Sequence, residues 1–375
     1  MSGELASTQE PPKQLGFLDI SPVPDLYDLP SGLRDIGVTA SFLSPFTDTV
    51  VGGLTKRVES LPLLRAAEIR TDLRPRALGM YAMIANMLIH NPRQDQQTNI
   101  LPPNISQPLL ELSTIYDIPP ILSYFHYILL NTEVISGIDD SSINRLRSLW
   151  KFTGTESEEL FIRVHAAIEA EAAVMVRAAR RVAQDSYQDI TQVSKDLTLI
   201  KKAVEQMIRL LGLMRKHLDK KEYKMQFDER LRPFLAHTQN VVYEGTDLAP
   251  QSWIGVSTIQ SPIGPLGEAM FGVRHNTEEI QDRLNTGLLY LPSTQRKLIT
   301  INRRSSLQER IIRSGDEEAA LSFDEALAAF AMFRSQQLEL AERYLVGRKP
   351  GKGSTKFKKF LIQVYEDTLR ARLLS

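Results

Sequence analysis

The chain has 375 residues, of which 42% are hydrophobic and 24% are charged, a composition typical of a soluble globular protein. Lys plus Arg and Asp plus Glu both number 45, and this balance argues against nucleic acid or a membrane as a partner recognised through overall charge. The sequence contains no cysteine, which excludes disulfides, thiolate metal ligands and cysteine nucleophiles.

The N-terminal residues 1–15 are polar, contain Pro11 and Pro12, and are expected to be disordered. They carry acidic residues and no apolar run, so they resemble neither a secretory signal nor a transit peptide. The most apolar run, Leu78–Ile89, is too short to span a bilayer. We therefore expect a cytoplasmic protein, and we expect it to be a monomer.

Residues 16–150 are interpreted as a small N-terminal domain. Its first part, Gly16–Gly53, is rich in Pro, Asp and Gly and is expected to be irregular, with at most a short strand. Helical patterning starts near Val58. The expected elements that follow are a helix over Arg76–His90 ended by Asn91-Pro92, an extended proline segment over Leu101–Pro108, and helices over Leu109–Tyr116 and Ile121–Asn131.

Residues 151–375 are interpreted as a large helical domain, which makes the fold class mostly all-α. Thr155-x-x-Glu158 is a capping box, and apolar residues at spacings of three and four predict a helix of about 30 residues behind it. The same spacing predicts a second long helix from Ile190 to Met214. Two further helices are expected over Ser322–Val346, capped by Ser322, and roughly over Lys356–Leu374, with looser segments at Thr246–Pro265 and Arg303–Gly315.

The helix Ser322–Val346 is the most informative segment, because its inward stripe is interrupted by polar side chains. Arg334 and Gln337 lie between Phe330 and Tyr344 at helical spacing. Burying such groups unpaired is costly, so we expect something to bind against this face.

Three other features of the sequence each allow two interpretations. Phe161, His165 and Glu169 share one face of the first long helix, where His165 is either a satisfied core histidine or a pocket histidine beside an aromatic wall. Arg232 either binds a carboxylate through its planar fork or is a surface residue at a helix end. The segment Gly347–Thr355 does not match a phosphate-binding loop in spacing or context; it is either a solvated basic loop or a glycine-containing loop over a pocket.

Several short motifs then occur in a distinctive order. They are Leu101-Pro102-Pro103-x-Ile105-x-x-Pro108, Ile118-Pro119-Pro120-Ile121-Leu122-x-Tyr124, Asn131, Val242-Tyr243-Glu244-Gly245, Tyr290-Leu291-Pro292, Arg334-Ser335 and Gly351-x-Gly353-x-Thr355. Together they resemble the indoleamine 2,3-dioxygenase family over roughly residues 55–372. The resemblance implies a small domain and a large all-helical domain with b-type haem between them. It also implies O2-dependent opening of the indole ring of tryptophan, or of a related indole, to an N-formylkynurenine-type product.

The resemblance also implies roles for individual residues. Phe161 matches an aromatic that packs on the indole, and Arg232 matches the partner of the substrate carboxylate. His165 matches a distal position that is Ser in animal members and His in the related tryptophan dioxygenases, where it faces the indole nitrogen. Further implied positions are Phe227 in the substrate pocket, Ser257 and Thr258 in a loop above the haem, Thr355 near the substrate ammonium, Arg334 at a haem propionate and Glu268 as its acidic partner. The loop Gly255–Pro262 is bulkier here than the family prefers.

Gln337 is the departure from the family pattern, because it falls where the family places the histidine that ligates haem iron. Arg334-Ser335 before it and Tyr344 after it keep the register, and no histidine occurs in Ser322–Ser375. A carboxamide is a far poorer ligand than imidazole. Three hypotheses follow: a haem dioxygenase with altered ligation, a repurposed or haem-free binder or enzyme of the same pocket, and a non-catalytic interaction protein.

Overall fold

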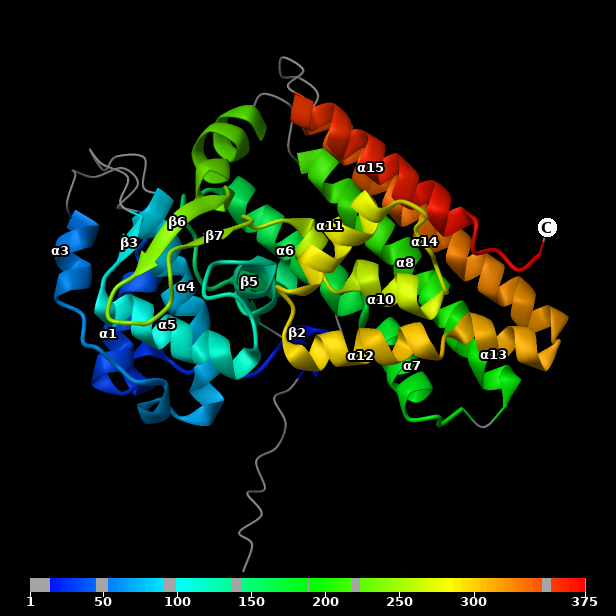
Figure 1. The fold of residues 1–375 in the computed structure, drawn as a ribbon, viewed down its shortest axis with the longest axis horizontal. Coiled ribbons are helices and arrows are strands. Elements are labelled where there is room, and N and C mark those ends of the chain that lie inside the picture. The colour runs from blue at the N-terminus through cyan, green and yellow to red at the C-terminus, as the bar shows by residue number, and fades with distance from the viewer. Residues whose placement is uncertain are drawn as a thin grey trace, which may run out of the picture.

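The computed structural model describes residues 14–44, 53–90, 99–135, 143–187, 189–217, 223–345 and 352–374. The expected disorder of residues 1–15 therefore lies almost entirely outside the described residues, as do Asn91-Pro92 and the glycine loop up to Gly351. Within the described part the chain is mainly helical, as predicted (Figure 1). None of its described helices combines the length and apolar character needed to cross a bilayer.

The longer helices follow one another along the whole chain. In order they are α1 (Ser31–Ser41), α3 (Gly53–Glu59), α4 (Arg74–His90), α5 (Pro103–Tyr116), α6 (Glu156–Glu171), α7 (Ala173–Ala183), α8 (Ile190–His217), α10 (Ile263–Met270), α11 (Glu278–Leu288), α12 (Ser293–Arg304), α13 (Leu307–Ser314), α14 (Glu317–Leu345) and α15 (Lys352–Leu369). The short helical turns are η1 (Leu26–Asp28), η2 (Ala66–Glu68), η3 (Thr71–Leu73), η4 (Phe125–Leu129), η5 (Ile143–Arg145), η6 (Tyr223–Leu231), η7 (Arg232–Leu235) and η8 (Thr258–Gln260).

The strands are short and form three small sheets. β1 (Gln14–Leu15) pairs with β2 (Leu18–Asp19), and β4 (Thr132–Val134) pairs with β5 (Leu146–Ser148), both antiparallel. β6 (Thr238–Tyr243) lies between β3 (Ile100–Leu101), which is parallel to it, and β7 (Gln251–Trp253), which is antiparallel.

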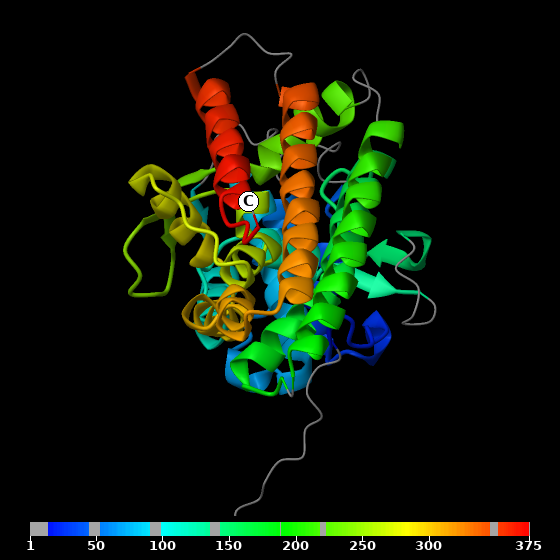
Figure 2. The same ribbon diagram turned by 90° about the vertical axis from the view of Figure 1, so that its right-hand side faces the viewer.

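Three long helices form the scaffold of the C-terminal half. α14 lies between α8 and α15 and packs against both (Figure 2). The buried face of α8 carries apolar residues from Val193 to Met214, as the sequence pattern predicted. One cluster of buried apolar side chains extends from Phe17 to Ala371, so the proposed domain boundary near residue 150 stays a prediction.

The predicted 30-residue helix is wrong in one respect, because it breaks at Ala172 into α6 and α7. The N-terminal segment packs on this junction at Gly16, where φ is +65° and a Cβ atom would lie 2.7 Å from the Glu169 carbonyl. The cap of α6 is confirmed, since the Thr155 side chain accepts from the Glu158 amide.

Other boundaries also differ from the predictions. The proline segment is helical from Pro103, because Ile105 and Leu109 are buried on one face and this packing outweighs Pro108. The segment Gly16–Gly53 contains α1, and Arg303–Gly315 contains α13, whose apolar residues are too few for a clear periodicity. The helix predicted over Ile121–Asn131 is only the π-helical turn η4.

The two C-terminal helices were placed a few residues late. α14 begins at Glu317, where Asp316 caps it by accepting from the Ala319 amide at 2.8 Å, so Ser322 is an interior residue and not the cap. α15 runs over Lys352–Leu369.

Candidate functional site

A cavity of about 60 Å³ lies between α6, α14, α15 and the segment around η8, and it is partly open to solvent. Its apolar wall comes from Ile168 of α6, Leu211 of α8, Phe333 of α14 and several neighbours. Its polar lining consists of Tyr124, His165, Ser257, Thr258, Ser261, Arg334 and Gln337. The structure thus brings His165, Ser257, Thr258, Arg334 and Gln337, all predicted site residues, to one cavity.

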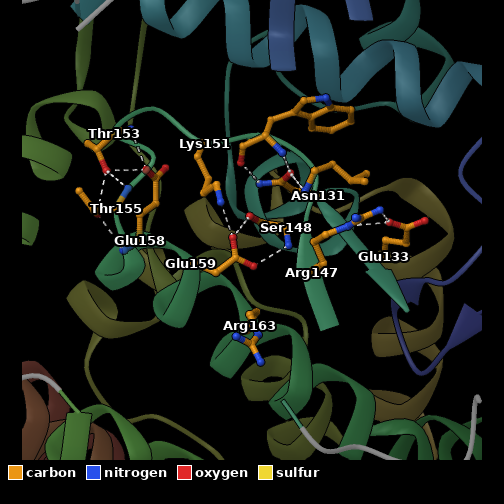
Figure 3. Close-up of polar contacts among 12 residues, drawn as sticks. Asn131, Glu133, Arg147, Ser148, Lys151, Thr153, Thr155, Glu158, Glu159 and Arg163 are labelled. Carbon is orange, nitrogen blue, oxygen red and sulfur yellow. Dashed lines mark hydrogen bonds and ion pairs between the residues drawn. The ribbon is translucent and has the colours of Figure 1, made fainter. Parts of the chain in front are cut away.

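The N-terminus of α6 is anchored by a polar network (Figure 3). The buried carboxylate of Glu158 accepts hydrogen bonds from the Tyr127 hydroxyl at 2.8 Å and from the Thr153 amide and hydroxyl, both at 2.7 Å. Next to it, Glu159 accepts from Lys151 and Ser148. This anchoring holds the helix whose next turns carry Phe161 and His165.

Three aromatic side chains meet beside the cavity. The ring centroid of Phe161 lies 4.2 Å from that of His165 and 5.0 Å from that of Phe227. Phe227 is almost fully buried on η6, while Phe161 is half-buried. The predicted aromatic wall therefore exists, although neither phenylalanine lines the cavity itself.

His165 is neutral at physiological pH. Its Nδ1 lies 2.8 Å from the Phe161 carbonyl oxygen, and because a carbonyl only accepts, Nδ1 carries the proton and Nε2 the lone pair. Burial lowers the pKa of His165 to about 4, with the Phe161 hydrogen bond opposing this. The imidazole therefore offers an acceptor nitrogen and no charge.

Arg334 belongs to a buried charge cluster behind the cavity. Its Nη2 donates to Glu268 at 2.5 Å, and Glu268 lies 3.5 Å from Nε2 of His275, whose Nδ1 is 2.7 Å from Asp367. Burial alone would raise the pKa of the Glu268 carboxyl, but Arg334 and His275 outweigh it and hold that pKa below its usual value. Neither His275 nor Asp367 was predicted as a site residue, because neither forms a motif with its neighbours along the chain.

Two glycines of α10 allow this contact. A Cβ atom on Gly264 would lie 3.0 Å from Nη2 of Arg334, and one on Gly267 would lie 2.4 Å from the Phe330 ring. The absence of side chains lets α10 approach α14 closely enough for Glu268 to reach Arg334.

Hydrogen bonds of Gln260 connect the segment before α10 to Tyr124. The buried Gln260 side chain accepts from the Tyr124 amide at 2.9 Å and the Ser257 amide at 3.3 Å, and donates to the Gly255 carbonyl at 3.2 Å. Ser257 and Thr258 line the cavity from this segment, and Thr258 is largely exposed.

Besides Phe161 and Phe227, two further predicted substrate residues are not among the residues that line the cavity. Arg232 begins η7 and is exposed. Thr355 lies in α15, with its side chain outside the described part. Their roles stay predictions.

Glu169 is a site feature whose role the sequence did not reveal, although its place on the His165 face was recognised. Its carboxyl is fully buried and accepts from the Ser261 hydroxyl at 2.6 Å. Burial raises the pKa of Glu169 to about 7, against the opposing effect of Ser261 and Tyr124.

The side chains that line the cavity could hold a haem propionate, but they do not include the usual ligand of haem iron. Arg334 has a buried Nε without a hydrogen-bond partner in the described part, and it lines the cavity, as an anionic propionate would require. The donor set on α14 does not fit the imidazole ligation expected for the iron, because Gln337 supplies only a carboxamide. No cluster of three or more metal-ligating side chains was found among the described residues.

Comparison with known proteins agrees with these features. The family model for indoleamine 2,3-dioxygenase matches residues 46–370. The chain is 26% identical to indoleamine 2,3-dioxygenase 2 of Homo sapiens over 348 residues, covering 89% of this chain and 82% of the relative. It is also 26% identical to indoleamine 2,3-dioxygenase 1 of Rattus norvegicus, covering 80% and 75%.

A third relative comes from a fungus. Indoleamine 2,3-dioxygenase acdA of Aspergillus candidus is 24% identical over 360 residues, covering 85% of this chain and 86% of the relative. The family match spans most of the chain and includes the elements that line the cavity, and so this chain belongs to the indoleamine 2,3-dioxygenase family.

Proposed function

We propose that this protein is a dioxygenase that opens the indole ring of tryptophan, or of a related indole, with O2 to give an N-formylkynurenine-type product. In this reaction the C2–C3 bond of the indole breaks and each of these carbons receives one oxygen atom of O2. The observation that carries the proposal is that one cavity is lined by Arg334 and by a neutral histidine, whose ring contacts Phe161 and, through it, Phe227. The relatives' names supply the reaction class.

Haem b is the cofactor that the family implies. Arg334 would hold a propionate through its unpartnered Nε, and the apolar walls from Ile168, Leu211 and Phe333 would hold the macrocycle. When bound, haem supplies the activation of O2. No step is assigned to Gln337, whose carboxamide is a poor substitute for imidazole.

The chain's own side chains would bind and orient the substrate. Nε2 of His165 would accept the hydrogen bond of the indole N–H. The indole would pack toward the aromatic wall of Phe161 and Phe227, which lies beside the cavity and outside its lining. Arg232 pairs with the substrate carboxylate and Thr355 lies near the ammonium, while Ser257 and Thr258 limit the height of the pocket. We propose that the protein acts in the cytoplasm as a monomer.

A second candidate follows from Gln337 alone. A carboxamide at the iron-ligand position favours a family member that binds haem weakly or not at all and uses the same cavity for an indole or an amino-acid-like ligand. The same lack of imidazole on α14 supports this candidate, whereas the retained Arg334–Glu268 pair supports the first.

One experiment separates the two functions. The protein is expressed with haem supplied, its visible spectrum is recorded with and without CO, and product absorbance is followed after addition of tryptophan and O2. A Soret band at one haem per chain that shifts with CO, together with product, supports the dioxygenase. A colourless protein that binds tryptophan in calorimetry supports the second candidate and removes the first.

A further inference from the structure

Glu169 is a buried carboxyl that no cation compensates among the described residues. Its Oε1 accepts from the Ser261 hydroxyl, and the Tyr124 hydroxyl also interacts with the carboxyl. The buried Oε2 meets no donor at ordinary hydrogen-bond geometry in the described part of the chain. Leaving a buried acceptor without a donor is costly. The arrangement is therefore maintained at the expense of stability, next to the cavity and not in a remote part of the core.

The groups that face Glu169 are few. Tyr124 faces it from the segment before η4, Ser261 from the segment before α10, and His165 lies one turn earlier on α6. His165 is neutral, because burial lowers its pKa to about 4, and among the described residues no Lys or Arg contributes to the electrostatics of Glu169. Gly16, which packs on the same turn of α6, has no side chain to contribute.

Two hydroxyl groups, those of Ser261 and Tyr124, connect Glu169 to the cavity. Ser261 and Tyr124 both line the cavity, whereas Glu169 lies behind them. The two segments that carry these hydroxyls are fixed near each other by Gln260. Burial, with the Glu169 carboxyl adding to it, raises the pKa of Tyr124 well above its usual value, so its hydroxyl keeps its proton.

We propose that Glu169, acting through the hydroxyls of Ser261 and Tyr124, is a proton-holding positioning residue, and that filling the cavity with an indole is coupled to the uptake of one proton. The inference rests on the proposed function in that it takes an indole as the cavity's ligand. An apolar ring displaces water and lowers the polarity beside Glu169, which disfavours the charged carboxylate further.

The sign of the coupling follows from linkage. The free protein has a Glu169 pKa of about 7, and the occupied cavity raises it. Indole binding is then fully favourable below about pH 7 and weakens as the pH rises through the window between the two pKa values. The dissociation constant increases up to about tenfold per pH unit in that window.

Infrared difference spectroscopy tests the carboxyl directly, without activity or ligand. Spectra of the full-length, haem-supplied protein are recorded between about pH 5.5 and 8.5, on either side of the raised pKa. The carbonyl band of a protonated carboxyl should be present at the acidic end, disappear around pH 7, and be missing in Glu169→Gln. Glu171→Gln, which removes a half-buried carboxylate from the same helix, should keep the band. Absence of the band from the wild type at every pH overturns the proposal.

Ser261→Ala provides a second variant that leaves the carboxyl in place. Loss of the Ser261 hydrogen bond removes a contact that stabilises the ionised form, so the midpoint of the band should move to higher pH. An unchanged midpoint contradicts the role given to Ser261.

Calorimetry with indole tests the coupling. Binding is measured in two buffers of different ionisation enthalpy, and the difference gives the number of protons taken up. Between the two pKa values of Glu169, the wild type and Glu171→Gln should take up close to one proton, falling to about half a proton at pH 7, and Glu169→Gln should take up none. Equal uptake in Glu169→Gln, or indole binding without uptake in the wild type, overturns the inference while leaving the proposed function intact. Failure of the proposed function shows instead as absence of product from tryptophan, with the infrared titration unaffected.

Discussion

Nη2 of Arg334 donates to Oε1 of Glu268 at 2.5 Å, across the close crossing of α14 and α10. Both side chains are largely buried, and the guanidinium is also 5.2 Å from the Phe330 ring centroid. This pair joins the wall of the cavity to the buried cluster with His275, so its loss affects both the fold and the site.

Glu268→Ala should destabilise the protein strongly, because it leaves a buried guanidinium without its carboxylate. Breaking a buried pair by removing one partner costs about 3–5 kcal/mol, measurable by urea denaturation. Glu325→Ala is the control, since Glu325 pairs with Lys201 at the surface and its loss should cost about 0–1 kcal/mol. A similar loss of unfolding free energy in the two variants would show that the Arg334–Glu268 pair is not shielded from solvent.

Glu158→Gln should destabilise the N-terminus of α6. The carboxylate accepts from Tyr127, Phe152 and Thr153, and an amide turns an NH2 group toward some of these donors. Each donor left unpaired costs about 1–3 kcal/mol. Glu156→Gln, at an exposed position of the same first turn, serves as the control in chemical denaturation, and an equal loss there would contradict the prediction.

His126 should make the protein sensitive to mild acid. Its ring is fully buried, its Nδ1 accepts from the Ser123 amide, and burial lowers its pKa to about 3. The folded state keeps His126 neutral while the unfolded chain binds a proton below about pH 6.5. The contribution to stability is therefore present above about pH 6.5 and falls by up to about 1.4 kcal/mol per pH unit toward pH 3.

The variant His126→Phe removes this titration and keeps an aromatic ring of similar size. Its free energy of unfolding should decline less steeply than that of the wild type between about pH 6.5 and 4. Identical slopes for the two proteins would assign the acid sensitivity to other groups.

Gln337→His should increase haem occupancy. Gln337 lines the cavity on the same helix as Arg334, and an imidazole there provides the usual neutral nitrogen ligand. The ratio of Soret to protein absorbance after haem addition measures the effect. Gln336→His is the control, because Gln336 binds Arg215 instead and should leave the ratio unchanged. An unchanged spectrum in Gln337→His would mean that the assigned register of α14 is wrong.

Arg232→Ala should weaken tryptophan binding and spare indole, which has no carboxylate. Loss of a hydrogen bond to a charged group costs about 1.5–3 kcal/mol, or roughly 10- to 150-fold in the dissociation constant. Titration calorimetry with both ligands makes the comparison, and Arg230→Ala, another exposed arginine nearby, is the control. Equal affinity of the wild type and Arg232→Ala for tryptophan would remove Arg232 from the site.

The sequence by itself determined the features that repeat locally or follow a fixed order. The apolar spacing of α8 and the Thr155 cap of α6 depend on residues three and four positions apart, so both were predictable. The ordered motifs indicated the family, and the register of α14 placed Arg334 and Gln337 side by side before their surroundings were known.

Tertiary structure alone decided the features that depend on contacts between distant residues. The break at Ala172 coincides with the close approach of Gly16, and the helical start of α5 depends on burial of Ile105 and Leu109. Glu169 meets Ser261, and His275 meets Asp367, each across 92 positions of sequence. Local spacing specifies which face of a helix is apolar, but burial of a carboxyl, and hence its pKa, depends on what packs against that face.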